Sequence, residues 1–588
     1  MNIKRISIII IIVITLAVYA NTLLNSFTGD DYYIVCANNF IKSWSNFPLL
    51  FSKKYISISN DIIFNTYHAK DYGSGEVTYR PVVTLSYMID YALWKLNPAG
   101  YHFTNILFHA FNAALLYIFI LLLARSNLLA LLASLIFAVH PINTDVVNSI
   151  SAREDLFVTF FLLSAFILFL KYRGYSGVKK KIAYIVSCVS FLLALLSKET
   201  AIMFVPLIFL YDFILSGRRL KDIALDLKSR YLGFIAAALF YLYIYVFVFR
   251  PSYGFYSLYA GRTLYSHILT SLKVLAGYVT AFAAPFGIAI TPPFYTPLTK
   301  TILDAGMIAS LIILVLLIGL AFRVYKYSKA ASFGLAWFFI AILPTSNIIR
   351  LVNMFSYRYM YFPGIGLCLA LAILLLKVAG SAPLKKISPY SQKIAMVLVV
   401  GGYMAVTIPQ NISWRNDFTV GQSQIERYPK IADSYRSVSK FYFDRGHFKE
   451  AVNILNTSLK YRPDDVLAYI DLGVCYLNLG MLDDAAGNLE KAVTLRPNFT
   501  DAYYILGSVY LNKNEFSKAK DAFLKATQLD PAHADAYNNL AVAYTQLGEF
   551  QDAKQALENA LRISPGHPYA QRNLEEIERY LAEEGNSK

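Results

Sequence analysis

Apolar stretches long enough to cross a bilayer follow one another from Ile6 to residue 411. A bilayer core needs about 20 apolar residues per helical span, and lipid admits only helices and closed barrels as spanning structures. The run 264–290, with Lys273 and Pro285, could span, re-enter or lie in the interface. The other apolar segments predict an all-α polytopic membrane domain over residues 1–411 with about eleven spans: 6–25, 102–124, 127–142, 155–171, 182–197, 200–215, 231–249, 302–321, 333–349, 359–376 and 394–411.

The net charge of +16 is unevenly distributed. From Trp414 onward the chain holds 20 Lys and Arg against 24 Asp and Glu, whereas the preceding part holds 34 against 14. Positive charge in the loops of an apolar domain indicates membrane topology, so we exclude nucleic acid as a partner. The loops predicted to be cytoplasmic from their basic residues are 171–181, 216–230, 323–329 and 377–393.

These loops share one side only if 264–290 does not cross the membrane. The N-terminus is then cytoplasmic, and the long outer loops are 26–99 and 250–301. The C-terminal part is extracytoplasmic, and a prokaryotic plasma membrane is favoured over the endoplasmic reticulum. The four cysteines form no CxxC pair, which gives no sign of a zinc site or a disulfide framework.

A 34-residue repeat begins at about residue 432. Its prolines, first-helix tyrosines and second-helix alanines recur in one register: Pro463, Pro497, Pro531 and Pro565; Tyr435, Tyr469, Tyr503 and Tyr537; Ala451, Ala485, Ala519 and Ala553. This is the tetratricopeptide pattern of two helices per repeat. We predict a linker or half-repeat at 412–431, four repeats forming an α-solenoid at 432–567, and a capping helix and tail at 568–588.

Two groups in the first outer loop could carry chemistry. Asp30 and Asp31 are adjacent carboxylates just past the first span. One could act as a general base on a hydroxyl, or the pair could hold a divalent cation; the alternative is a solvated loop end. No other cofactor is indicated. Arg80 is suited to holding a phosphate through two parallel hydrogen bonds, and the alternative is an interfacial anchor.

A polar stripe within the second apolar segment consists of His102, Asn105, His109 and Asn112. Spacings of 3, 4 and 3 place these side chains on one helix face, where they could line a site or bond a neighbouring helix.

Further polar residues gather in predicted outer turns. The candidates for substrate binding are His140, Arg153, Glu154, Asp155, Lys198, Glu199 and Arg358. The alternatives are a capping turn around His140, with Arg153 paired to a neighbouring acid, and a mutual pair between Lys198 and Glu199.

The order of these motifs resembles a known family. Asp-Asp after the first span, Tyr-Arg-Pro, "GYHFTNILFHAFNA", "IFAVHPINTDVVNSISAREDL", "LLSKET", "LPTSNI" and "YRYMYFPGIG" are similar to the transmembrane and tetratricopeptide-repeat O-mannosyltransferases of the GT-C superfamily. The resemblance covers nearly the whole chain. It implies transfer of a sugar, typically mannose, from a polyprenyl phosphate at the outer face, with an essential acid that corresponds to Asp30 or Asp31. The family often has Glu-Arg-Tyr where this chain has Tyr357-Arg358-Tyr359.

We therefore expect an inverting glycosyltransferase. A polyprenyl-phosphate sugar enters from the bilayer, Arg80 with Arg153 or Arg358 holds its phosphate, and Asp30 or Asp31 takes the proton of an acceptor hydroxyl. The repeats would hold a protein acceptor or partner. Two other functions stay open: a non-enzymatic membrane scaffold that presents the repeats, and a ligase or polymerase of lipid-linked glycans.

Overall fold

The computed structural model describes residues 3–52, 79–226, 230–249, 263–286, 299–348, 351 and 353–586. The chain forms two compact units, Met1–Val420 and Gly421–Lys588, and the boundary falls inside the predicted linker. Parts of the predicted outer loops (53–78, 250–262 and 287–298) lie outside the described residues. All regular elements within the described ranges are helices, which confirms the predicted all-α class.

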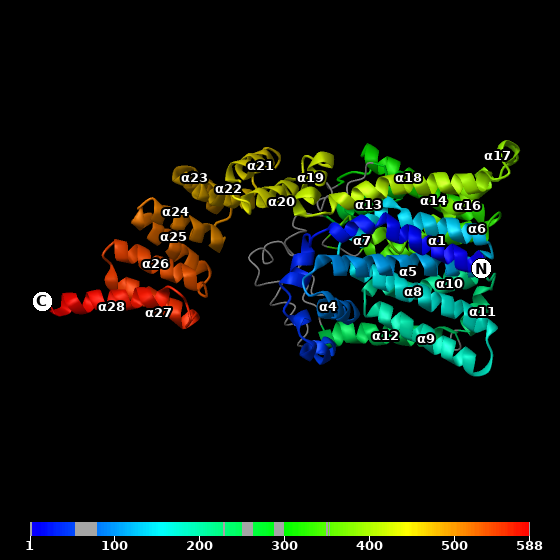
Figure 1. Ribbon diagram of the computed structural model, residues 1–588, viewed down its shortest axis with the longest axis horizontal. Coiled ribbons are helices and arrows are strands. Elements are labelled where there is room, and N and C mark those ends of the chain that lie inside the picture. The colour runs from blue at the N-terminus through cyan, green and yellow to red at the C-terminus, as the bar shows by residue number, and fades with distance from the viewer. Residues whose placement is uncertain are drawn as a thin grey trace. The chain divides into compact units, whose positions relative to one another are not determined.

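The first unit, here the membrane unit, is a helical bundle (Figure 1). Its helices are α1 (Ile3–Val18), α4 (Pro81–Trp94), α5 (Pro98–Ala124), α6 (Asn127–Val139), α7 (Thr144–Asn148), α8 (Arg153–Lys171), α9 (Gly177–Leu195), α10 (Phe204–Ile214), α11 (Leu220–Leu225), α12 (Leu232–Tyr243), α13 (Leu264–Ala283), α14 (Ala305–Tyr325), α15 (Lys329–Ile342), α16 (Gly364–Ala379), α17 (Ala382–Ile387) and α18 (Ser391–Ser413). Each of the eleven predicted segments overlaps one of these helices.

Among the described residues, five helical segments are long and apolar enough to cross a membrane. They are Ile3–Leu24, Pro98–Ala124, Arg153–Gly174, Ala305–Tyr325 and Ser391–Ser413. The pair Asn127–Val139 and Pro141–Asn148, bent by 51°, would make a sixth. The chain is thus an integral membrane protein, and the figure of eleven spans stays a prediction. The undecided run 264–290 contains α13, which ends at Ala283.

Local signals delimit the long helix α5. The side chain of Asn97 accepts a hydrogen bond from the amide of Ala99, and Pro98 occupies the first turn, where a missing N–H does no harm. The helix ends at Arg125, whose φ of 53° cannot continue it. Ser126 then caps α6 by accepting from the amide of Leu129, so α5 and α6 return beside each other through a two-residue turn.

Glycines let α15 and α16 approach closely. A Cβ added to Gly334 would lie 2.5 Å from the carbonyl oxygen of Gly366, and one added to Gly366 would lie 2.1 Å from that of Gly334. Small residues commonly permit such contacts between membrane helices. Beside this crossing, the buried Trp337 packs against Phe119 and Phe166, each with ring centroids 5.7 Å away.

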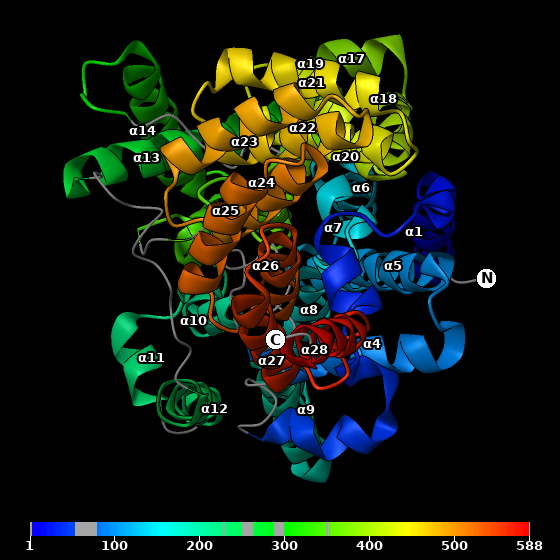
Figure 2. The ribbon, with the colours of Figure 1, turned by 90° about the vertical axis from the view of Figure 1, so that its left-hand side faces the viewer.

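The second unit, here the repeat unit, is a stack of helix pairs (Figure 2). The pairs are α20 (Ala432–Phe443) with α21 (Phe448–Tyr461), α22 (Val466–Asn478) with α23 (Leu482–Leu495), α24 (Thr500–Asn512) with α25 (Phe516–Leu529), and α26 (Ala534–Gln546) with α27 (Phe550–Ile563), followed by α28 (Ala570–Asn586). The recurrent alanines Ala451, Ala485, Ala519 and Ala553 are all completely buried. The predicted solenoid is therefore confirmed. Helix α19 (Asp417–Arg427) leads into it from the membrane unit.

Candidate functional site

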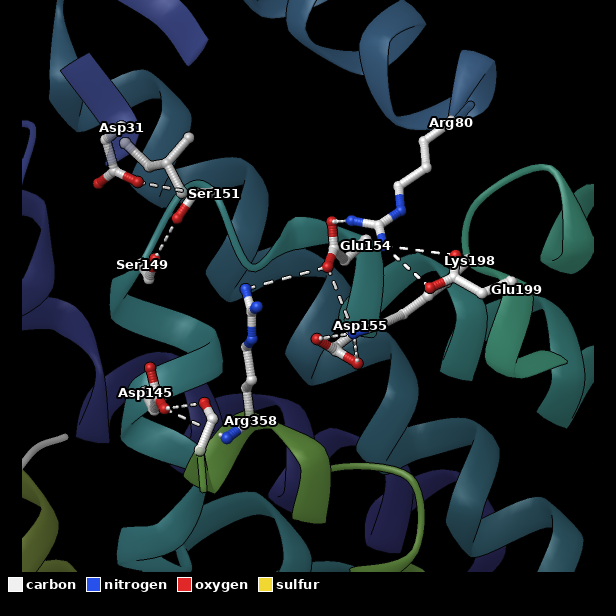
Figure 3. Close-up of polar contacts among 12 residues, drawn as sticks. Asp31, Arg80, Asp145, Ser149, Ser151, Glu154, Asp155, Lys198, Glu199 and Arg358 are labelled. Atoms are coloured by element: carbon white, nitrogen blue, oxygen red, sulfur yellow. Dashed lines mark hydrogen bonds and ion pairs between the residues drawn. The ribbon is translucent and has the colours of Figure 1, made fainter. Parts of the chain in front are cut away.

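Two acids at the start of α8 lie at the centre of a charged cluster (Figure 3). Glu154 and Asp155 occupy the first turn of the helix, where the helix dipole favours negative charge. Lys198 Nζ lies 2.7 Å from both carboxylate oxygens of Asp155 and 3.3 Å from Glu154 Oε1. All three side chains are at least nine-tenths buried. Their charges must therefore be balanced within the protein.

Arg80 reaches the same cluster from the start of α4. One terminal nitrogen donates to Glu154, and the other lies 3.2 Å and 3.3 Å from the two carboxylate oxygens of Glu199. Pro81 opens the helix directly after it. The Arg80 side chain is 15% exposed, so solvent reaches it, unlike Lys198. Arg80 thus joins α4, α8 and the loop between α9 and α10.

Arg358 is the third cation that points at Glu154. It lies in the short 3-10 helix Tyr357–Met360, and its Nη1 is 4.0 Å from Glu154 Oε1, with 24% of the side chain exposed. Its backbone amide donates to Asp145 Oδ2 at 3.2 Å, and Ser356 Oγ lies 3.5 Å from the same oxygen. Asp145 on α7, absent from our predicted binding residues, therefore positions the Arg358 segment.

The two adjacent acids of the first outer loop differ sharply. Asp31 is completely buried: its carboxylate accepts from the amide of Ser151 at 2.7 Å and from that of Thr28 at 3.3 Å. Burial, opposed by these hydrogen bonds, raises the pKa of Asp31 to about 7. Asp30 has exposed surface, but the protein around it still raises the pKa of its carboxyl by desolvation, an effect that nearby Arg358 opposes and Glu154 reinforces. The sequence could not distinguish the two, whereas the structure leaves Asp30 accessible.

Arg153 lies apart from the charged cluster. Its completely buried guanidinium forms an ion pair with Asp90 at 2.7 Å, donates to Asn105 Oδ1 at 2.8 Å and to the carbonyl of Tyr101 at 3.0 Å, and packs over the Tyr87 ring. These partners enclose the side chain, so it cannot reach a ligand without breaking them. Arg153 and Asn105, both predicted to bind substrate, instead join α4, α5 and α8.

The three predicted histidines also serve the packing of the bundle. His109 bonds Tyr361 Oη at 2.7 Å and the Ala138 carbonyl at 2.9 Å, and all three histidines are completely buried. His140 bonds the Phe282 carbonyl at 3.1 Å and stacks on the Phe282 ring. His102 Nε2 lies 3.4 Å from the carbonyl of Ser26, just before the Asp30 loop. These contacts hold α5, α6 and α13 against their neighbours and hold the start of the Asp30 loop against α5.

No group of three or more His, Cys, Asp or Glu able to hold a metal ion occurs within the described ranges. Asp31 is turned toward backbone amides. The arrangement therefore presents an exposed carboxylate, Asp30, within electrostatic reach of the partly exposed guanidinium of Arg358, and a second partly exposed guanidinium, that of Arg80, binds the same Glu154. Such a site can accept a proton at one point and bind a phosphate at another.

Comparisons with known proteins agree with both units. Tetratricopeptide-repeat family models match residues 442–487 and 504–568. Protein O-mannosyl-transferase TMTC3 is 23% identical over 509 residues in mouse and 24% over 502 in human, each over 80% of this chain and 52% and 53% of the relative. Human TMTC2 is 32% identical over 165 residues, 28% of this chain and 18% of the relative.

The chain spans about half the length of the TMTC3 proteins it matches. Among solved structures, a crystal structure of MamA has 31% sequence identity with a TM-score of 0.24, covering 25% of this chain and 85% of that one. The homologues of this chain are O-mannosyl-transferases of the TMTC type, as the resemblance of its motifs predicted.

Proposed function

We propose that this chain, a homologue of the TMTC-type protein O-mannosyl-transferases, is a membrane glycosyltransferase that moves a monosaccharide from a polyprenyl phosphate to a hydroxyl of a protein acceptor. The observation that carries the proposal is the exposed Asp30 within electrostatic reach of Arg358, whose guanidinium points at Glu154 together with that of Arg80. The names of the relatives favour mannose as the sugar and a protein as the acceptor.

Lys198, Arg80 and Arg358, the three cations of the cluster, differ in how easily each could bind a phosphate. Lys198 is 4% exposed and bonds both oxygens of Asp155, so its charge serves the protein. Arg358 has the longest ion pair, 4.0 Å to Glu154, and the greatest exposure. Arg358 therefore loses the least ion-pair energy when its side chain turns toward a phosphate. We assign it the main contact with the donor phosphate. Arg80 supports the same phosphate from the other side of Glu154.

The transfer step then uses Asp30 as the general base. The acceptor oxygen attacks the anomeric carbon while its proton passes to the Asp30 carboxylate. The bond between that carbon and the phosphate oxygen breaks, and polyprenyl phosphate leaves with its added negative charge facing Arg358 and Arg80. A single displacement of this kind inverts the anomeric configuration.

The proposal includes an orientation, drawn from the basic loops of the sequence. The N-terminus faces the cytoplasm, and the Asp30 loop and the repeats face outward. Cysteine labelling from the cell exterior should reach Asn586→Cys and should not reach Ser176→Cys, which precedes α9. Labelling of position 176 from the cell exterior would contradict the proposed orientation.

The decisive assay uses purified protein, a polyprenyl-phosphate mannose and a serine- or threonine-containing peptide. Asp30→Asn keeps the shape of the side chain and removes the base, so transfer should fall by about 100-fold or more. Asp31→Asn is the comparison variant: its remaining oxygen can still accept from the amide of Ser151, so transfer should fall less than in Asp30→Asn. Transfer by Asp30→Asn at the wild-type rate would reject the assigned base, and a wild type inactive with every polyprenyl-phosphate sugar would reject the function.

A further inference from the structure

Hydrogen bonds fasten the end of the first membrane helix and the loop after it to the last membrane helix. Asn21 donates to the carbonyl of Ile408 at 2.9 Å, and Asn411 donates to the carbonyl of Val18 at 2.9 Å. Asn411 is completely buried, and its side-chain oxygen accepts from Asn148 at 2.9 Å. Residues nearly 400 positions apart are therefore held in register beside each other.

The contacts continue past the end of α18, along the segment that leads to the repeats. The amide of Ser26 donates to the carbonyl of Arg415 at 2.9 Å, and the amide of Gly29 donates to Asp417 Oδ1 at 2.8 Å. Gly29 has a φ of +52°, a conformation that glycine adopts without strain. The next residue is Asp30, the proposed base.

Asp30 thus lies between two anchors. On one side, the Gly29 amide is bound by Asp417; on the other, the Asp31 carboxylate is bound by the amide of Ser151 at 2.7 Å. Between these anchors the chain turns, with the Asp31 amide bonded to the carbonyl of Thr28 at 3.0 Å. Fixing both neighbours limits where the Asp30 carboxylate can point.

Asp417 is not required as the cap of its own helix. Helix α19 is capped by the residue before it: Asn416 Oδ1 accepts from the amide of Thr419 at 3.0 Å, and Thr419 Oγ1 accepts from the amide of Asn416 at 3.1 Å. The cap of α19 thus comes from Asn416 and Thr419, whereas the bond to the Gly29 amide comes from the Asp417 carboxylate. Capping of α19 and binding of the Gly29 amide therefore belong to two adjacent residues, Asn416 and Asp417, and mutation can separate them.

From this arrangement we infer that Asp417 is a positioning residue for Asp30, which makes the linker to the repeats part of the catalytic loop. The inference rests on the proposed function. Helix α19 begins at Asp417, and its later turns belong to the repeat unit, where Gln424 accepts from Ser434 Oγ at 2.8 Å.

The test compares Asp417→Ala, Asp417→Asn and Asn416→Ala in the full-length protein. Asp417→Ala removes the acceptor of the Gly29 bond, and kcat for transfer should fall about 10- to 100-fold, the loss expected from a displaced catalytic group. The KM for the polyprenyl-phosphate donor should stay within about twofold, because the phosphate contacts Arg80 and Arg358. Asp417→Asn keeps an oxygen that can accept, and should stay within about threefold of wild type.

Asn416→Ala weakens the cap of α19 and keeps the Gly29 bond, so it should retain transfer. Hydrogen–deuterium exchange of residues 26–33 gives a readout independent of the reaction, and it should speed up about tenfold or more in Asp417→Ala alone. Wild-type kcat in Asp417→Ala, or an equal loss in Asn416→Ala, would overturn the inference. If the wild-type protein transfers no sugar, the proposed function is rejected. The exchange rates then test the inference by themselves: unchanged exchange of residues 26–33 in Asp417→Ala would show that Asp417 does not position the Asp30 loop.

Discussion

Lys198 and Asp155 form a bidentate ion pair, with Nζ 2.7 Å from each carboxylate oxygen and both side chains nearly inaccessible to solvent. The pair joins the segment between α9 and α10 to the first turn of α8. Glu154, the neighbour of Asp155, then faces Arg80 and Arg358. The most buried cation of the cluster therefore organises the site, and the two more exposed ones are available to a ligand.

We predict that Lys198→Met destabilises the membrane unit. Removing one partner of a buried ion pair leaves an uncompensated charge, which costs about 3–5 kcal/mol. The measurement is the thermal midpoint of the purified protein in detergent. Lys273→Met is the matched control, since Lys273 pairs with Asp304 at 3.0 Å with both side chains about 40% exposed, and water screens such a pair. Equal shifts in the two variants would contradict a structural role for Lys198.

The buried Asp31 should make stability depend on pH. Burial raises its pKa to about 7 in the folded protein, whereas an unfolded carboxyl titrates near about 3.9. Between these values the folded state holds the proton more firmly, so the free energy of unfolding is greatest at low pH and falls as pH rises, by up to roughly 4 kcal/mol.

Asp31→Asn removes this titration. Its oxygen can still accept from Ser151, but the bond from Thr28 is lost at a cost of about 1 kcal/mol. Thermal midpoints measured from pH 5 to pH 8 should therefore fall more steeply for the wild type than for Asp31→Asn. Parallel curves would show that Asp31 does not titrate in this range.

Much of the charged cluster can be located from the sequence alone. Arg80, Glu154, Lys198 and Arg358 stand out because acidic residues are few in the membrane part of the sequence and gather, with these cations, in its predicted outer segments; the structure brings the four together. The repeats are equally predictable from the sequence, because four copies in one register define where each helix begins and ends.

Other assignments depend on contacts that no spacing reveals. Arg153 lies in the same predicted outer turn as Glu154, yet Asp90 from a neighbouring helix, with other protein groups, encloses its side chain. Asp30 and Asp31 differ only through the turn that buries one of them. Asp417 lies in a polar stretch after the last apolar segment, where an isolated acid carries no signal; only the fold brings it to Gly29.

The two arginines assigned to the phosphate should respond differently to lysine. Arg358→Lys replaces a planar fork by a point charge at the main contact, so the KM for the donor should rise about tenfold. Arg80→Lys also breaks the bridge between Glu154 and Glu199, so its thermal midpoint should fall as well. Arg153→Lys serves as the control, with lower stability and little change in donor KM, because its partners are all protein groups. A donor KM unchanged in Arg358→Lys would remove it from the site.

The last prediction separates the work of the two units by truncation. The membrane unit has its own buried core, and every residue assigned to chemistry or positioning lies at or before Asp417. A chain ending after Arg427 keeps the bond from Gly29 to Asp417, so donor hydrolysis and transfer to a short peptide should persist. Transfer to a folded protein acceptor should drop, because we expect the repeats to bind the acceptor and raise its effective concentration.

A second truncation, ending after Ser413, also removes Arg415 and Asp417, the partners of Ser26 and Gly29. It should lose transfer to the short peptide as well, by the 10- to 100-fold expected of Asp417→Ala. Both truncated proteins must show a cooperative thermal melt for the comparison to count. If the chain ending after Arg427 is folded and still loses donor hydrolysis, the repeats belong to the catalytic unit itself, and the division proposed between chemistry and acceptor capture is wrong.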